Sequence, residues 1–212
     1  MEIKGAIFDF DGTVFDSMHI WKGIKFRFFD KIGLVLSEKD KEEFAGLFLL
    51  DAIELAKKKF EIKMTNDELF KSFFELIEGR YLTETEPKND IIEFLEKLKA
   101  KGVKMGIATA TSEKALEAVL EKYNMRDYFS CIYSTYTVGA SKTEPTVYNT
   151  VLECLGTDKA TTWVFEDALY AAKTAKAHGY NVVGIYDKSE PEAEELKKLV
   201  DKYIYNYSEL DI

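Results

Sequence analysis

The stretch Ile7-Phe8-Asp9-Phe10-Asp11-Gly12-Thr13 decides how the rest of the chain is interpreted, because an apolar run ends there in two carboxylates and a glycine. The run that begins at Ile3 is typical of a strand buried on both faces, and Asp11-Gly12 is a turn signal that ends it. Asp9 and Asp11 are therefore expected at the carboxyl end of a strand, where open α/β sheets bind their ligands. Two neighbouring carboxylates can serve as a nucleophile and a proton donor. For this stretch alone, a plain turn with solvated aspartates is the alternative.

The composition is that of an ordinary soluble globular protein, with 46% hydrophobic and 32% charged residues among 212. The net charge of -9 argues against a nucleic-acid partner and against binding to an anionic membrane. We find neither a signal-like N-terminus nor an apolar run of membrane-spanning length, and therefore expect a cytoplasmic protein, which we take to be a monomer. Cys131 and Cys154 fit small buried hydrophobes in a reducing compartment, although the sequence leaves a disulfide open.

The region from 16 to 86 carries almost no strand pattern and strong helical periodicity. Phe70, Phe73, Phe74 and Ile77, for example, follow each other at helical spacing. Such spacing is typical of the packed faces of a helical bundle. We therefore expect these phenylalanines to form a core.

The character of the chain changes at Pro87, where apolar strand-like runs begin to alternate with amphipathic helices. We expect helices over 90–100, 112–123, 145–155, 168–178 and 192–200, and strands over 103–109, 128–134, 161–165 and 182–186. This alternation predicts an α/β fold, a parallel sheet with helices on both faces. Residues 1–15 and 87–212 would form the α/β core, and 16–86 an inserted helical domain. Because the first strand must return to the sheet, we expect the insertion to cover the edge that carries Asp9 and Asp11.

Later strand ends offer further chemical groups. Thr109 ends one strand, and its hydroxyl and the backbone N–H of Ala110 are suited to bind an anion beside a helix start. Thr111 or Ser112 would cap that helix. Lys142 follows the next strand and is a point charge suited to a phosphate.

Glu166 and Asp167 end another strand and would share a small crevice with Asp9 and Asp11. Four carboxylates cannot all stay charged together without a cation. Mg²⁺ is the natural counter-ion, because it prefers oxygen ligands.

This order of groups, Asp-x-Asp, then Thr, Lys and an acidic pair, each at a strand end, resembles the haloacid dehalogenase superfamily of aspartate-nucleophile phosphotransferases. The resemblance covers essentially the whole chain, and the helical insertion looks like the family's subclass I cap. Asp9-Phe10-Asp11-Gly12-Thr13 is its most specific motif. The resemblance implies a Rossmann-like core with an inserted α-helical cap domain.

The resemblance also implies a role for each candidate residue. Asp9 would be the nucleophile that forms an aspartyl-phosphate, and Asp11 the acid that protonates the leaving oxygen and then activates water. Thr109 and the N–H of Ala110 would bind the transferring phosphoryl group, and Lys142 would steady its charge. Mg²⁺ would be held by Asp9, the backbone carbonyl of Asp11, and Asp167 with Glu166 close by.

Two departures from the family pattern concern loops around the site. The family usually has proline after the lysine, whereas this chain has Thr143. Ala168 and Ala171 stand where serine and glycine are common. Every proposed catalytic group is retained.

Asp11 favours phosphoryl chemistry, because relatives that cleave carbon–halogen bonds do not need an acid at that position. We therefore predict a magnesium-dependent phosphatase acting on a small phosphomonoester. A β-phosphoglucomutase-like sugar-phosphate mutase is the alternative, but its second phosphate needs a basic residue that the cap loop 45–51 lacks. Phe48, Leu49 and Leu50 in this loop either screen the leaving group or belong to the cap core. A non-catalytic phosphate-binding protein on the same fold is a third possibility.

Overall fold

The computed structural model describes residues 2–47 and 49–212, except for the side chains of Leu49 and Leu50. It divides into two compact units. The first consists of Met1–Met18 and Glu84–Ile212, and the second of His19–Thr83. The insertion expected from the sequence, 16–86, is three residues longer at each end than this second unit.

The first unit is built on a parallel sheet of six strands in the order β5-β4-β1-β6-β7-β8. Its strands are β1 (Gly5–Phe8), β4 (Lys104–Thr109), β5 (Cys131–Ser134), β6 (Thr162–Glu166), β7 (Asn181–Ile185) and β8 (Lys202–Ile204). Ile7 of β1 pairs with Gly106 on one side and Val164 on the other. The strand order reverses at β1, so the residues that follow it lie at the central crevice of the carboxyl edge.

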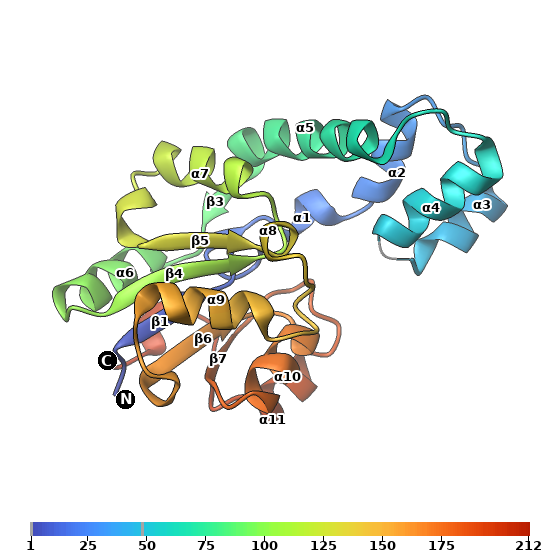
Figure 1. The fold of residues 1–212 in the computed structure, drawn as a ribbon. Helices are drawn as coiled ribbons and strands as arrows, with labels where there is room; N and C mark the ends of the chain where they lie inside the picture. The colour runs from blue at the N-terminus through green and yellow to red at the C-terminus, as the bar shows by residue number, and fades with distance from the viewer. Residues whose placement is uncertain (1, 48) are drawn as a thin grey trace. The chain divides into compact units, whose positions relative to one another are not determined.

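Helices cover both faces of this sheet (Figure 1). One face carries α9 (Thr146–Leu155), α10 (Leu169–Ala177) and α11 (Ala193–Leu199), and the other α6 (Ile91–Ala100) and α7 (Glu113–Lys122). The shorter helices are α8 (Thr135–Val138) and the 3-10 turns η1 (Arg126–Tyr128), η2 (Lys159–Thr161) and η3 (Tyr207–Glu209). The predicted α/β class with a parallel sheet is confirmed.

The core lies on both sides of β1, because adjacent residues of a strand point to opposite faces. Ile7 packs with residues of α9 and α10 such as Val147 and Ala172. Phe8 points the other way and stacks on Phe165, with ring centroids 4.4 Å apart. All four residues of β1 are buried, as the apolar run predicts.

Three strands are missing from the prediction. β8 is three residues long, and β2 (Phe15–Asp16) and β3 (Glu86–Pro87) form a two-stranded antiparallel pair where the chain leaves and re-enters the first unit. Elements of two or three residues are too short to show a periodic pattern. The strand expected over 128–134 begins only at Cys131, because η1 occupies 126–128.

Cys131 of β5 and Cys154 of α9 form a disulfide, with Cα atoms 6.7 Å apart. The sequence favoured two buried cysteines in a reducing compartment and left a disulfide open, and the structure has the disulfide. The pairing follows from packing, since α9 lies directly against β5. Sequence separation alone gave no means of seeing this contact.

Helices are the regular secondary structure of the second unit in its described residues. It contains α1 (Met18–Trp21, which begins in the first unit), α2 (Ile24–Lys31), α3 (Glu38–Ala45), α4 (Leu49–Phe60) and α5 (Asn66–Glu84, which ends in the first unit). Phe73 and Ile77 are fully buried, whereas Phe70 and Phe74 are half-buried. The expected phenylalanine core is present, with Phe28, Phe29 and Phe44 completely enclosed.

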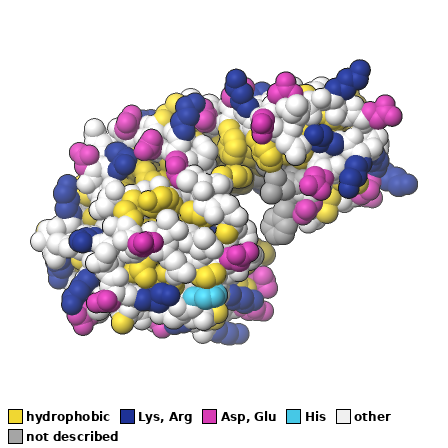
Figure 2. All heavy atoms as spheres, viewed as in Figure 1, with side chains coloured by type: hydrophobic (Ala, Val, Ile, Leu, Met, Phe, Trp, Pro, Cys, Tyr) yellow, Lys and Arg dark blue, Asp and Glu magenta, His cyan; other side chains and the backbone are white. Residues whose placement is uncertain are grey.

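The surface carries acidic and basic side chains interspersed over the face shown in Figure 2. None of the helices in the described residues is long and apolar enough to cross a membrane.

Candidate active site

Asp9 follows β1 directly, and its carboxylate meets the ammonium of Lys142. Lys142 lies in the loop before α9 and also donates to Glu166 Oε2 at 2.9 Å. All three side chains are buried, although they come from segments 24 to 157 residues apart in the sequence. The lysine predicted to act at this edge is therefore inside the site, bonded to the predicted nucleophile.

Tyr148 was not anticipated from the sequence. It lies on the first turns of α9, fully buried, and its hydroxyl donates to Glu166 Oε2 at 3.1 Å. Glu166 thus accepts from both Lys142 and Tyr148, which fixes its carboxylate. In the helical pattern of α9, position 148 lies on the apolar face, so the sequence favours a core role for Tyr148.

Asp167 follows β6 and lies beside the turn that ends β1. Gly12 has a φ of 78°, in the left-handed region, and a β-carbon built on it would collide with the Asp167 carboxylate. Thr13 approaches Asp167 Oδ1 at 3.5 Å. Glycine at position 12 is therefore required for two reasons, the left-handed backbone conformation and the closeness of the Asp167 carboxylate.

Asp11 is held by two hydroxyl groups. Ser17 donates to Oδ1 and Thr111 to Oδ2, each at 2.6 Å. Thr111 was expected as a possible helix cap, but Ser112 is the N-cap of α7, where it accepts from the N–H of Ala115. The two hydroxyls fix the carboxylate of the predicted acid at the same edge as Asp9.

Thr109 and Ala110 end β4 next to this group. Thr109 is fully buried and its Oγ1 accepts from the N–H of Thr111 at 2.9 Å. Ala110 is exposed. The hydroxyl of Thr109 therefore lies in the turn that also delivers Thr111 to Asp11.

Of the four acidic residues expected at the metal site, three have their carboxylates close together. Asp9, Glu166 and Asp167 each offer a carboxylate oxygen, and these oxygens lie within 4.8 Å of one another. The Asp11 side chain lies outside this group. Three buried carboxylates beside one lysine fit a hard divalent cation, because their charges are only partly compensated.

Burial raises the pKa of Asp9 well above 3.8, and Glu166 and Asp11 add to the rise while Lys142 opposes it. Burial likewise raises the pKa of Asp167, helped by the charges of Asp9 and Glu166. For Lys142, burial alone would lower the pKa, but the charges of Asp9 and Glu166 outweigh it and raise the pKa well above 10.5. Lys142 is thus a permanent cation, and the carboxylates need more positive charge than it supplies.

Thr143 stands where the resemblance led us to expect proline, next to Lys142. Its backbone N–H donates to Ser141 Oγ at 3.3 Å, a bond that proline could not make. Ser141 and Thr143 thereby close a short polar turn beside the lysine.

A cation also lies at the cap loop 45–51 of the helical unit. The loop itself contains no basic residue. Lys25 of α2 donates to the carbonyls of Phe44, Ala45 and Leu47, at 2.6, 3.1 and 2.5 Å. Burial lowers the pKa of Lys25. The predicted role of Phe48, Leu49 and Leu50 lies outside the described residues.

The sequence profile of the haloacid dehalogenase-like hydrolases matches residues 6–185, which is most of the chain. The chain belongs to the haloacid dehalogenase-like hydrolase family. The predicted membership is confirmed, and with it the hydrolase class.

Two relatives of this haloacid dehalogenase-like hydrolase are curated phosphatases. Hexitol phosphatase B of Escherichia coli K12 is 25% identical over 181 residues, covering 83% of this chain and 80% of the relative. The phosphorylated carbohydrates phosphatase of Thermotoga maritima is 26% identical over 178 residues, covering 84% and 82%. Both names support the phosphatase interpretation of the sequence.

A solved structure shows the same fold for the haloacid dehalogenase-like hydrolase. CbbY from Rhodobacter sphaeroides, in complex with phosphate, superimposes with a TM-score of 0.81 at 19% identity. The match covers 98% of this chain and 96% of CbbY.

Proposed function

We propose that this hydrolase is a Mg²⁺-dependent phosphatase that removes phosphate from a small phosphomonoester through an aspartyl-phosphate on Asp9. The observation that carries the proposal is the buried contact of Asp9 with Lys142, which is also paired with Glu166, at the carboxyl edge of the sheet. A carboxylate held in this way points one oxygen at a cation and leaves the other for attack. Phosphoryl transfer needs mainly such positioning and charge neutralisation.

In the first step, a carboxylate oxygen of Asp9 attacks phosphorus and the bond to the leaving oxygen breaks. Asp11 gives its proton to that oxygen, and the alcohol departs. In the second step, Asp11 takes a proton from water as the water attacks phosphorus. The bond between phosphorus and the Asp9 oxygen breaks, which releases inorganic phosphate and regenerates Asp9. The hydroxyls of Ser17 and Thr111 hold Asp11 in place for both proton transfers.

Thr109, the N–H of Ala110 and Lys142 would bind the oxygens of the transferring group. Lys142 remains protonated through both steps, so it stabilises charge without exchanging a proton. Asp9, Asp167 and the backbone carbonyl of Asp11 would hold Mg²⁺, with Glu166 beside them. When bound, the ion supplies the positive charge that keeps these carboxylates ionised and offsets the phosphate oxygens.

A phosphorylated sugar or sugar alcohol is the substrate class we propose, supported by the names of the two curated relatives. The expected covering of the carboxylates by residues 16–86 and a cytoplasmic location stay predictions.

The test is phosphate release from a panel of phosphomonoesters that includes sorbitol 6-phosphate, glucose 6-phosphate and phosphoglycolate. We expect turnover with Mg²⁺, none with EDTA, and none for Asp9→Asn. Asp127→Asn, an exposed aspartate of η1, is the matched control and should retain full activity. Turnover that survives EDTA or Asp9→Asn would contradict the mechanism.

Two other outcomes point to the alternatives. Conversion of glucose 1-phosphate in the presence of a bisphosphate activator, without net phosphate release, would identify a mutase. Absence of turnover across the whole panel, with phosphate still bound, would identify a non-catalytic binding protein.

A further inference from the structure

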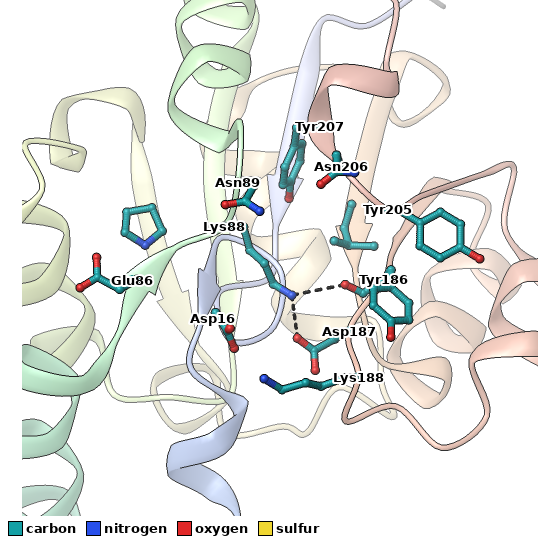
Figure 3. A pocket seen from close by; sticks show the side chains of 12 residues that line it. Asp16, Glu86, Lys88, Asn89, Tyr186, Asp187, Lys188, Tyr205, Asn206 and Tyr207 are labelled. Carbon is teal, nitrogen blue, oxygen red and sulfur yellow. Dashed lines mark hydrogen bonds and ion pairs between the residues drawn. The ribbon is translucent and has the colours of Figure 1, made fainter.

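A cavity opens in the first unit, and none of the proposed catalytic residues lines it (Figure 3). Its volume is about 480 Å³, which falls in the range of small-molecule sites. Its walls come from the segments after β7 and β8 and from the β2–β3 pair. The lining residues are Asp16, Glu86, Pro87, Lys88, Asn89, Ile185, Tyr186, Asp187, Lys188, Tyr205, Asn206 and Tyr207.

One wall of this cavity is aromatic. Tyr186 and Tyr205 lie side by side, with ring centroids 5.1 Å apart and planes tilted by 37° (Figure 3). They are 41% and 51% exposed, high values for such large rings. Lys197 lies 5.6 Å from the centre of the Tyr205 ring and helps to hold it. The rings therefore offer exposed apolar surface within a polar cavity.

The framework of the cavity is fixed by hydrogen bonds. Lys88 donates to Asp187 Oδ2 at 2.6 Å and to the carbonyl of Tyr186 at 3.3 Å, as the dashed lines in Figure 3 show. Tyr207 donates to the carbonyl of Thr13 at 3.1 Å, and the backbone N–H of Asn206 donates to Glu209 at 2.8 Å. A ligand would therefore enter a preformed site and lose little affinity to reorganisation.

The charge of the lining excludes a strongly anionic ligand. Lys88 is paired with Asp187, and the Glu86 carboxylate accepts from the Tyr123 hydroxyl at 2.9 Å. Asp16 and Lys188 are the other charged side chains of the lining, so the lining has no surplus of positive charge. Lys188 in the same wall disfavours a cation. An uncharged ligand suits this balance best.

The remaining polar groups suit a compound rich in hydroxyls. Asn89 carries an amide that both donates and accepts, the hydroxyls of Tyr186 and Tyr205 do the same, and the ammonium of Lys188 donates. A hydroxyl also donates and accepts, so a polyol can match such a mixed wall in several directions, whereas the donors and acceptors of a nucleobase all lie in one plane. The C–H faces of the same compound can pack on the tyrosine rings.

We propose that this cavity is a second binding site, specific for an uncharged monosaccharide or sugar alcohol. The proposal rests on the lining residues alone and does not depend on the phosphatase mechanism.

The test is a titration of the protein with sorbitol and with glucose, monitored by amide chemical shifts in ¹H–¹⁵N spectra. We expect saturable shifts at Tyr186, Lys188 and Asn206, with a dissociation constant in the millimolar range. Tyr186→Ala and Tyr205→Ala should each weaken binding at least fivefold. Tyr136→Ala removes a tyrosine that is 44% exposed but outside the cavity, and should leave binding unchanged.

Parallel titrations with glucose 6-phosphate, inosine and choline test the ligand class. Tighter binding of any of these at the cavity would overturn the assignment to an uncharged polyol. Unchanged affinity of Tyr186→Ala and Tyr205→Ala for sorbitol and glucose would also overturn it. Chemical-shift changes confined to residues 9–13 on addition of these polyols would do the same. Spectra of the folded variants, recorded first, separate loss of binding from loss of structure.

Discussion

Gly12 and Asp167 lie so close together that the glycine cannot carry a side chain. A β-carbon at position 12 would collide with the Asp167 carboxylate, and the φ of 78° is strained for any other residue. We expect Gly12→Ala to lose activity and to lower the free energy of unfolding by about 2–4 kcal/mol. Urea unfolding and phosphatase assays measure the two effects. Gly102→Ala is the control, because Gly102 has a φ of 73° with nothing within 4 Å, and should cost about 1 kcal/mol without affecting catalysis.

Ser17 and Thr111 each donate one hydrogen bond to Asp11. Ser17→Ala and Thr111→Val should each lower kcat about tenfold, the cost of about 1–1.5 kcal/mol for one such bond, with little change in KM. Steady-state kinetics on the best substrate of the panel measure this. Ser112→Ala, which removes the neighbouring helix cap instead, should lower stability by about 1 kcal/mol and leave kcat unchanged. An equal loss of kcat in all three variants would argue against a specific role for the two hydroxyls.

Lys142 is the cation that Asp9 and Glu166 share. Lys142→Met would leave these carboxylates facing each other without it, so we expect kcat to fall by about 10²–10³. Lys173→Met removes a lysine whose side chain is 55% exposed and should retain activity. Turnover of the Lys142 variant near the wild-type rate would remove the lysine from the mechanism.

Asp187 is buried, which favours its neutral form, but its bonds from Lys88 and Ser189 outweigh this effect and hold its pKa below 3.8. A carboxylate with a lowered folded-state pKa stabilises the protein above its unfolded pKa, and this contribution is lost as the pH falls through the folded value. Asp187→Asn should therefore lower the free energy of unfolding by about 2 kcal/mol at pH 7 and by less below pH 3.8. Urea unfolding of both proteins across this range is the measurement. If the difference in the free energy of unfolding between the two proteins does not shrink in acid, the Lys88–Asp187 ion pair contributes nothing to stability.

The Cys131–Cys154 disulfide closes a loop with a sequence separation of 23. Because the bond restricts the unfolded chain, reduction should lower the free energy of unfolding by about 3 kcal/mol. Thermal unfolding with and without reductant measures the change. The double variant Cys131→Ala/Cys154→Ala should give one melting temperature under both conditions, and a wild-type protein insensitive to reductant would contradict the prediction.

Much of the fold was predictable because each long element carries its own periodic pattern. The strand after Val103 and the helix before Gly156 are examples, with ends correct to within a residue. The site residues Asp9, Lys142 and Asp167 were predictable because parallel strands bring their carboxyl ends to one edge. The role of each in catalysis stays a prediction.

What the sequence did not reveal depends on contacts between distant segments. Ser17, Thr111 and Tyr148 sit in patterns that suit a turn, a cap and a core helix, and only the folded chain brings them to carboxylates. The disulfide and the cavity beside β8 have the same origin. No local pattern reports which helix packs on which strand.

The position of β1 has a consequence for how this protein is made. β1 is the first strand of the sheet to be synthesised, yet it lies in the middle, paired with residues 104–107 and 162–165. A growing chain therefore carries Asp9 and Asp11 on a strand that has no partner until residues 104–107 are made, and only one partner until residues 162–165 follow. The long-range pairing that completes the site must come late and carries a high loop-closure cost. An N-terminal fragment that stops before β6 would contain the signature motif and both its carboxylates, but not the fold that makes them work.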